Sequence, residues 1–71
     1  MEDQEFLEKL GQRIAQLRKE KGMTQVEFAE KLGIQRTALA RIETGNVNTT
    51  ILNLRNISQT LQTSIEELIN I

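Results

Sequence analysis

The stretch from Thr24 to Glu43, TQVEFAEKLGIQRTALARIE, predicts two short helices joined by one tight turn. Thr24 and Glu27 have the spacing of a capping box, in which the threonine hydroxyl and the glutamate carboxylate each accept a backbone N–H of the first turn. Gly33 ends the first helix, because glycine adopts the left-handed conformation that other residues resist. A second helix from about Arg36 to Glu43 follows at once, and helices joined by so short a link cross steeply.

Three further helices are expected around this pair, and no segment alternates like a strand. Residues 4–21 carry apolar side chains at helical spacing. Thr49 or Thr50 is a suitable N-cap for a fourth helix, and Ser64 opens a short fifth helix with a second capping-box spacing. The sequence therefore predicts one all-α domain of five helices over residues 1–71.

Two positions within these helices bear on packing. Gly11 lies inside the first helix and costs it about 1 kcal/mol relative to alanine, and the sequence leaves open whether another backbone approaches it there. Leu52 falls off the apolar face of the fourth helix, and the core-facing stripe of that helix is expected to consist of Ile51, Leu54, Ile57 and Leu61.

The composition excludes several classes of site. The chain has no cysteine and no histidine, which rules out disulfides, thiolate or imidazole metal ligands, and Ser/His or Cys/His nucleophile pairs. We therefore expect no enzyme, no metal site and no cofactor. There is no run of about 18 apolar residues, and the N-terminus is acidic where a secretory signal would be basic, so a cytoplasmic protein without membrane contact is expected.

Charge limits how this chain could bind nucleic acid. Nine basic and ten acidic residues give a net charge of −1, so the chain lacks the overall positive field of a non-specific nucleic-acid binder. Any such binding must come from a local patch.

The second helix of the central pair has two different faces. At about 100° per residue, Leu39 and Ile42 fall on one side and a polar strip falls on the other. The strip is about 12 Å long, comparable with the width of the major groove of B-form DNA. Arginine can donate to guanine O6 and N7 at once, and threonine offers a hydroxyl or a methyl group. The strip consists of Arg36, Thr37, Ala40, Arg41 and Thr44.

Possible phosphate contacts lie at both edges of this helix pair. Gln25 would bring an amide and a helix N-terminus to the DNA backbone, and Asn46, Asn48 and Thr49 offer donors beyond the far end. Simpler explanations remain open, since arginines on helix surfaces are often merely solvated and the Asn and Thr residues suit an ordinary turn.

The segments LRKEKGMTQVEFAEKLGI and RTALARIETG resemble the Cro/cI-type (XRE family) helix-turn-helix domains of phage repressors and their bacterial relatives. The resemblance extends from about Leu10 to Leu68. It includes a small residue, Ala29, inside the first helix of the pair, where a larger side chain would push the crossing helix away. The resemblance implies a lambda-repressor-like five-helix fold with the helix-turn-helix proper at 24–43.

The resemblance also implies roles for single residues. Arg18 and Glu43 occupy positions that form an ion pair between the first helix and the end of the recognition helix in similar repressors. Base edges would be contacted by Arg36, Thr37 and Arg41, with Ala40 in the same register, and phosphates by Gln25, Thr44, Asn46 and Asn48. The chain departs from the family pattern at 46–48, which often carries lysine or arginine, and at Gln62, where glycine often closes the fourth helix.

The sequence thus predicts a sequence-specific transcriptional regulator that binds double-stranded DNA as a homodimer. Its operator would be pseudo-palindromic, with half-sites about one helical turn apart and the second helix of the pair in the major groove. Leu52, Ile69 and Ile71 are apolar residues without an evident core role, so they are expected at the dimer contact. No small-molecule effector is expected. The alternative is a protein-interaction module on the same scaffold, antitoxin-like or co-activator-like, which the near-neutral charge would suit.

Overall fold

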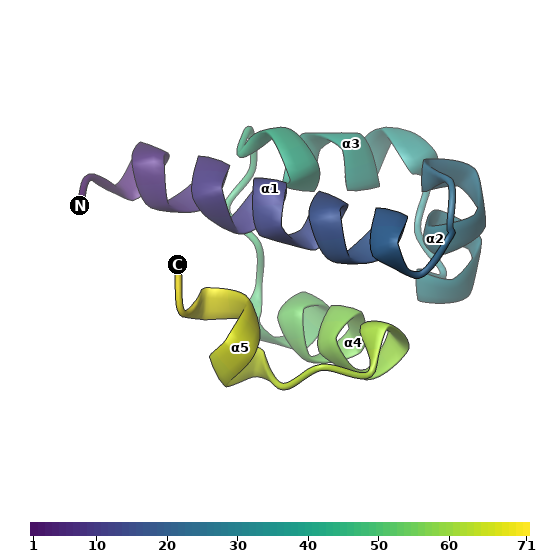
Figure 1. The fold of residues 1–71 in the computed structure, drawn as a ribbon. Helices are drawn as coiled ribbons and strands as arrows, with labels where there is room; N and C mark the ends of the chain where they lie inside the picture. The colour runs from purple at the N-terminus through teal and green to yellow at the C-terminus, as the bar shows by residue number, and fades with distance from the viewer.

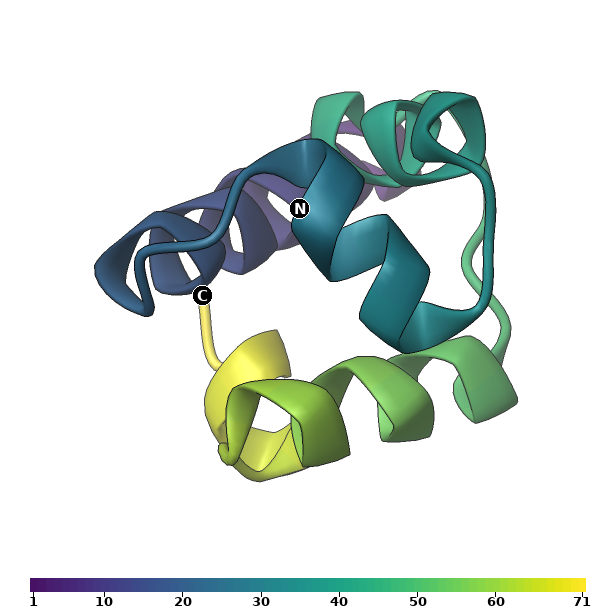
Figure 2. The same cartoon turned by 90° about the vertical axis from the view of Figure 1, so that its right-hand side faces the viewer.

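The computed structural model describes residues 1–71 as five α-helices without a strand, which confirms the predicted all-α architecture. The helices are α1 (Asp3–Glu20), α2 (Gln25–Leu32), α3 (Arg36–Thr44), α4 (Ile51–Leu61) and α5 (Ile65–Ile69). The long helix α1 runs through the middle, with α3 on one side of it and α4 and α5 on the other (Figure 1). Helix α2 stands across one end of this arrangement and crosses α3 steeply (Figures 1 and 2). Both chain ends lie on the same side of the molecule.

The caps of the central pair form as predicted. The Thr24 hydroxyl accepts the N–H of Glu27 at 3.1 Å, and the Glu27 carboxylate accepts the N–H of Thr24 at 2.8 Å. Gly33 then closes α2 in the left-handed conformation, with φ of 73°. These local signals set where α2 begins and ends, and therefore where α3 can start.

The two later helices are capped by residues that the sequence singled out, one of them only in part. Thr50, one of the two candidates, caps α4 by accepting the N–H of Asn53 at 3.1 Å. The Ser64 hydroxyl accepts the N–H of Glu67 at 3.0 Å, but the Glu67 carboxylate accepts from side-chain hydroxyls instead of the Ser64 backbone. The second capping box is therefore only half formed.

The core draws on all five helices, and its most enclosed side chains include Phe28, Ile14 and Leu39. Ile51 was expected in the core stripe of α4 but is 66% exposed. Helical periodicity assigns a residue to a face, but it does not say whether another element covers that face at the first turn. The buried hydrophobic cluster comprises Leu10, Ile14, Phe28, Ala29, Leu32, Leu39, Ile42, Leu54, Ile57, Leu61 and Leu68.

The C-terminal residue corrects another expectation. Ile71 was predicted to lack a core role, yet it is partly buried and packs against the hydrophobic cluster. The reason is that the chain turns back toward α1 after α5 (Figure 1), which brings its last side chain to the core. Leu52 and Ile69, in contrast, are 70% and 41% exposed.

Two long-range hydrogen bonds connect the C-terminal ends of α3 and α2 to side chains of other helices. The Gln4 amide donates to the carbonyl of Gly45 at 3.0 Å, and the Asn56 amide donates to the carbonyl of Leu32 at 3.0 Å. These bonds satisfy backbone acceptors at the C-terminal ends of α3 and α2, which have no partner within their own helices. None of the five helices combines the length and the apolar character that crossing a bilayer requires.

Candidate nucleic-acid interface

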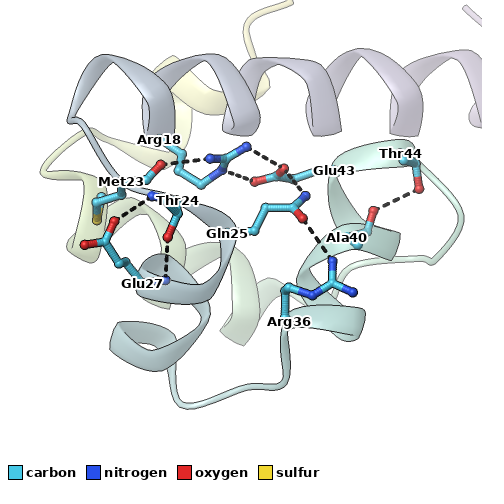
Figure 3. A network of polar contacts seen from close by, with 9 residues as sticks. All are labelled: Arg18, Met23, Thr24, Gln25, Glu27, Arg36, Ala40, Glu43 and Thr44. Carbon is cyan, nitrogen blue, oxygen red and sulfur yellow. Dashed lines mark hydrogen bonds and ion pairs between the residues drawn. The ribbon is translucent and has the colours of Figure 1, made fainter.

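A buried ion pair fixes the end of α3 against α1. Arg18 and Glu43 are each only 7% exposed. Nε of Arg18 donates to Oε2 of Glu43 at 2.8 Å, and Nη2 donates to Oε1 at 3.2 Å, so the contact is bidentate (Figure 3). The remaining nitrogen, Nη1, donates to the carbonyl of Met23 at 2.8 Å. One side chain of α1 therefore holds both the turn before α2 and the last turn of α3.

Gln25, the first residue of α2, extends this network toward solvent. Its Nε2 donates to Oε1 of Glu43 at 2.9 Å, and its Oε1 accepts from Nη1 of Arg36 at 3.3 Å (Figure 3). The sequence pointed to Gln25 only as a phosphate contact. In the structure its side chain bridges the buried carboxylate and the first residue of α3.

Helix α3 has the two faces that its periodicity predicts. Leu39 and Ile42 are 0% and 5% exposed and join the core. On the opposite side Arg36, Thr37 and Arg41 are exposed, and Ala40 is half-buried among them. The polar strip is thus an outward surface of a helix whose inner surface is fully packed.

The predicted phosphate contacts at and beyond the end of α3 fall into two groups. The Thr44 hydroxyl donates to the carbonyl of Ala40 at 2.9 Å and accepts from the Asn46 amide at 3.1 Å, so these two residues form one unit at the end of the helix. Asn48 is exposed and lines a groove together with Asp3 and the first turns of α1. The groove that Asn48 lines therefore also carries an acidic residue.

Sequence reasoning missed the contribution of α1 to this surface. A shallow groove beside the ion pair is lined by Gln25 and Thr44, and on its other wall by Gln12, Gln16 and Lys19 of α1. The sequence did contain a signal for this contribution, because residues spaced by four and three, as these three are, share one face of a helix. Only the packing of α1 on α3 reveals that this face adjoins the predicted contacts.

The start of α2 carries a fixed negative charge. The hydrogen bond from the Thr24 backbone N–H holds the pKa of the exposed Glu27 carboxyl below its ordinary value, and the Thr24 hydroxyl and the charge of Lys31 act in the same direction. A carboxylate at a helix N-terminus also interacts favourably with the helix dipole.

The comparison with known families matches this geometry. A helix-turn-helix family model matches residues 14–68, which contain α2, α3 and α4, the C-terminal part of α1 and most of α5. The chain belongs to the helix-turn-helix family. The predicted resemblance to Cro/cI-type (XRE) domains is thereby confirmed.

Individual relatives of this helix-turn-helix protein are regulators. The HTH-type transcriptional regulator SinR of Bacillus licheniformis is 42% identical over 62 residues, which cover 86% of this chain and 56% of SinR. The chain therefore spans little more than half the length of that curated relative. Transcriptional regulators of this kind are not enzymes.

Solved structures share the fold as well. The restriction-modification controller protein C.AhdI from Aeromonas hydrophila is 32% identical with a TM-score of 0.83, covering 87% of this chain and 94% of that protein. SinR, a master regulator for biofilm formation whose structure was solved in complex with DNA, is 40% identical with a TM-score of 0.81, covering 86% and 98%. The lambda-repressor-like fold expected from the sequence is confirmed by these neighbours.

Proposed function

We propose that this chain is a sequence-specific DNA-binding transcriptional regulator that binds a pseudo-palindromic operator as a homodimer. Helix α3 would enter the major groove, with Arg36, Thr37 and Arg41 at base edges and Ala40 in the same register. The observation that carries the proposal is the combination of an exposed polar strip with a fully anchored helix. A contact surface held on a rigid element can meet bases in a preset geometry.

The anchoring comes from two directions. Leu39 and Ile42 bind the inner face of α3 to the core, and the buried bidentate pair between Arg18 and Glu43 holds its last turn. SinR, which shares this fold and 40% of its residues over the matched region, was solved in complex with DNA, which supports the same role for this chain.

Phosphate contacts would come from both ends of the helix pair. Gln25 and Thr44 line one groove with Lys19 of α1, and Asn46 and Asn48 are exposed beyond α3. Because the net charge is −1, affinity would depend on this local surface rather than on a general attraction to DNA.

Arginine substitution tests DNA binding. An operator is first selected from a pool of random duplexes, and binding is then measured by gel shift. Arg36→Ala and Arg41→Ala are each expected to weaken operator binding by about 1–3 kcal/mol and to relax the base preference at one position per half-site. Arg13→Ala is the matched control, because it removes the same charge from the other side of α1. Gly11 packs against the backbone of Glu43 in α3, and Arg13 lies about 200° around α1 from Gly11, on the side turned away from α3. Unchanged affinity of the double variant Arg36→Ala/Arg41→Ala would refute the proposal.

The dimer contact is proposed at α4 and α5. Leu52 and Ile69 are exposed apolar side chains there, and burying such residues drives self-association. Analytical ultracentrifugation at tens of micromolar should give a dimer for the wild type and a monomer for Leu52→Glu/Ile69→Glu. Val26→Glu, which charges an equally exposed apolar site on α2, should remain dimeric. A monomeric wild type would exclude this contact.

A further inference from the structure

The peptide group between Gly45 and Asn46 is held at both of its ends. Its carbonyl oxygen accepts from Nε2 of Gln4, in the first turn of α1, at 3.0 Å. Its N–H, at the other end of the same plane, donates to the carbonyl of Arg41 in α3 at 2.9 Å. Because a trans peptide group is planar, bonds at its two ends fix the orientation of the plane. Helices α1 and α3 therefore jointly set the direction in which the chain leaves α3.

The backbone of α1 also restricts the path of the chain at this point. A β-carbon on Gly45 would lie 2.7 Å from both the Cα and the backbone nitrogen of Glu8. Figure 1 shows the linker passing α1 on its way to α4. Gly45 is buried, whereas the next three residues, Asn46, Val47 and Asn48, are exposed. The chain is thus fixed at Gly45 and open to solvent directly after it.

The exposed residues that follow include two of the proposed phosphate contacts, Asn46 and Asn48. Asparagine has a short side chain with few rotamers, so the backbone that carries it decides where its amide can reach. A hydrogen bond from that amide to a phosphate oxygen requires a separation of about 3 Å. A tilt of the peptide group before Asn46 would therefore move these donors away from the phosphate.

The first turns of α1 are themselves unsuited to contact DNA. Up to residue 8 every charged side chain is a carboxylate, and carboxylates repel phosphates. These are Glu2, Asp3, Glu5 and Glu8. Gln4 also precedes residues 14–68, which the family model matches, so its bond to Gly45 lies outside the matched region. Any effect of Gln4 on DNA binding must then pass through the loop that it holds.

We propose, on the basis of the DNA-binding function proposed above, that Gln4 is a positioning residue for the phosphate contacts of Asn46 and Asn48. It orients the peptide group between Gly45 and Asn46 and so presents the loop of residues 46–48 to the DNA backbone. Phosphate contacts carry no sequence information directly. Loss of the Gln4 bond should therefore weaken binding to every sequence by the same factor and leave base preferences unchanged.

The test maps phosphate contacts one at a time. An operator selected from random duplexes is prepared in copies that each carry one uncharged methylphosphonate, and binding to each copy is measured by gel shift. The phosphates that the loop contacts are those at which this replacement weakens the wild type more than it weakens Asn46→Ala/Asn48→Ala. Gln4→Met keeps the length of the side chain and removes the donor. Because Gln4 is exposed, the variant should fold, which circular dichroism checks.

We expect Gln4→Met to bind the unmodified operator about twofold to tenfold more weakly, since a segment that must be ordered on binding costs affinity in that range. The effect of methylphosphonate should shrink at the phosphates of the loop and nowhere else. Asn56→Leu is the matched control, because it removes an amide-to-carbonyl bond of the same length, 3.0 Å, at the end of α2. It should also destabilise the fold in urea but leave every methylphosphonate effect unchanged.

Three results would overturn the proposal. In the first, Gln4→Met keeps the wild-type effect of methylphosphonate at the phosphates of the loop. In the second, Gln4→Met loses contacts at other phosphates instead. In the third, no phosphate depends on Asn46 and Asn48. All three differ from failure of the DNA-binding function itself, in which the wild type would select no operator.

Discussion

A β-carbon on Gly11 would lie 2.4 Å from the backbone carbonyl oxygen of Glu43. The backbones of α1 and α3 therefore touch with no side chain between them, which answers the question that the sequence left open about this glycine. The carboxylate of the same Glu43 is held by Arg18 of α1. Backbone packing and an ion pair thus fix the last turn of α3 independently.

Gly11→Ala should destabilise the fold. In a helix free of neighbours alanine would be favoured over glycine by about 1 kcal/mol, but here the added methyl group overlaps α3, and overpacking of this kind costs about 1–3 kcal/mol. Urea denaturation measures the change. Gln12→Ala, on the exposed neighbouring position, should stay within about 0.5 kcal/mol of wild type. A higher melting temperature for Gly11→Ala would contradict the close contact.

Removing one partner of the buried ion pair should be costly. Arg18→Met leaves the Glu43 carboxylate buried without its counter-charge, and the expected loss is about 3–5 kcal/mol in the free energy of unfolding. Lys9→Met breaks a pair of the same charge type with Glu5, but that pair is about half exposed and spans 3.9 Å. Its loss should cost about 1 kcal/mol or less.

Removing both partners of the buried ion pair should lower the stability of the fold less than removing Arg18 alone. Arg18→Met/Glu43→Leu leaves no unpaired buried charge, and apolar replacements of buried pairs are often neutral or stabilising. We expect the double variant to be more stable than Arg18→Met alone, with a coupling energy measurable in a double-mutant cycle. Additive losses would indicate that the two side chains contribute separately.

Gln62→Gly should stabilise the protein. Gln62 closes α4 with φ of 57° and is the only non-glycine residue with positive φ. The left-handed conformation costs a residue with a β-carbon about 1–2 kcal/mol, which glycine avoids. Part of that gain is offset by the greater freedom of glycine in the unfolded chain, so we expect about 0.5–1 kcal/mol in thermal or urea unfolding. Gln59→Gly, inside the same helix, should destabilise by about 1 kcal/mol.

The ionisation of Glu27 should make the free energy of unfolding depend on pH in the acid range. Its pKa is lowered in the folded chain from an ordinary value of 4.5, so the unfolded state binds this proton more tightly than the folded state does. The contribution of Glu27 is then complete above pH 4.5 and disappears as the pH falls through the lower folded value. The advantage of wild type over Glu27→Gln in unfolding free energy should therefore shrink between neutral and strongly acid pH. An advantage that grows on acidification would contradict this.

Local signals predicted most of the fold. Thr24, Glu27 and Gly33 determine the ends of α2 through contacts within a few residues, so the sequence alone located them. The exposure of Ile51 and the burial of Ile71 depend on which distant element covers each position, and no local pattern contains that information.

The predicted interface likewise has one part that the sequence alone reveals and another part that depends on how the helices pack. The polar strip of α3 follows from helical periodicity and was anticipated. The link from Gln25 to Glu43 joins residues 18 positions apart, and it emerges only when α2 and α3 are folded at their angle. The groove lined by both Asp3 and Asn48 depends likewise on the packing of α1 against the linker after α3.

The two-faced character of α3 has a consequence for how such a protein can diverge. Thr37 and Arg41 project outward and contribute nothing to the core, whereas Leu39 and Ile42 do. New operator preferences can therefore arise by replacing outward residues, one at a time, while the scaffold keeps its stability. Residue 36 is less free, because Gln25 faces it with a hydrogen-bond acceptor. Retargeting a protein of this design should begin at 37 and 41, and a change at 36 to a residue that cannot donate should be accompanied by one at 25.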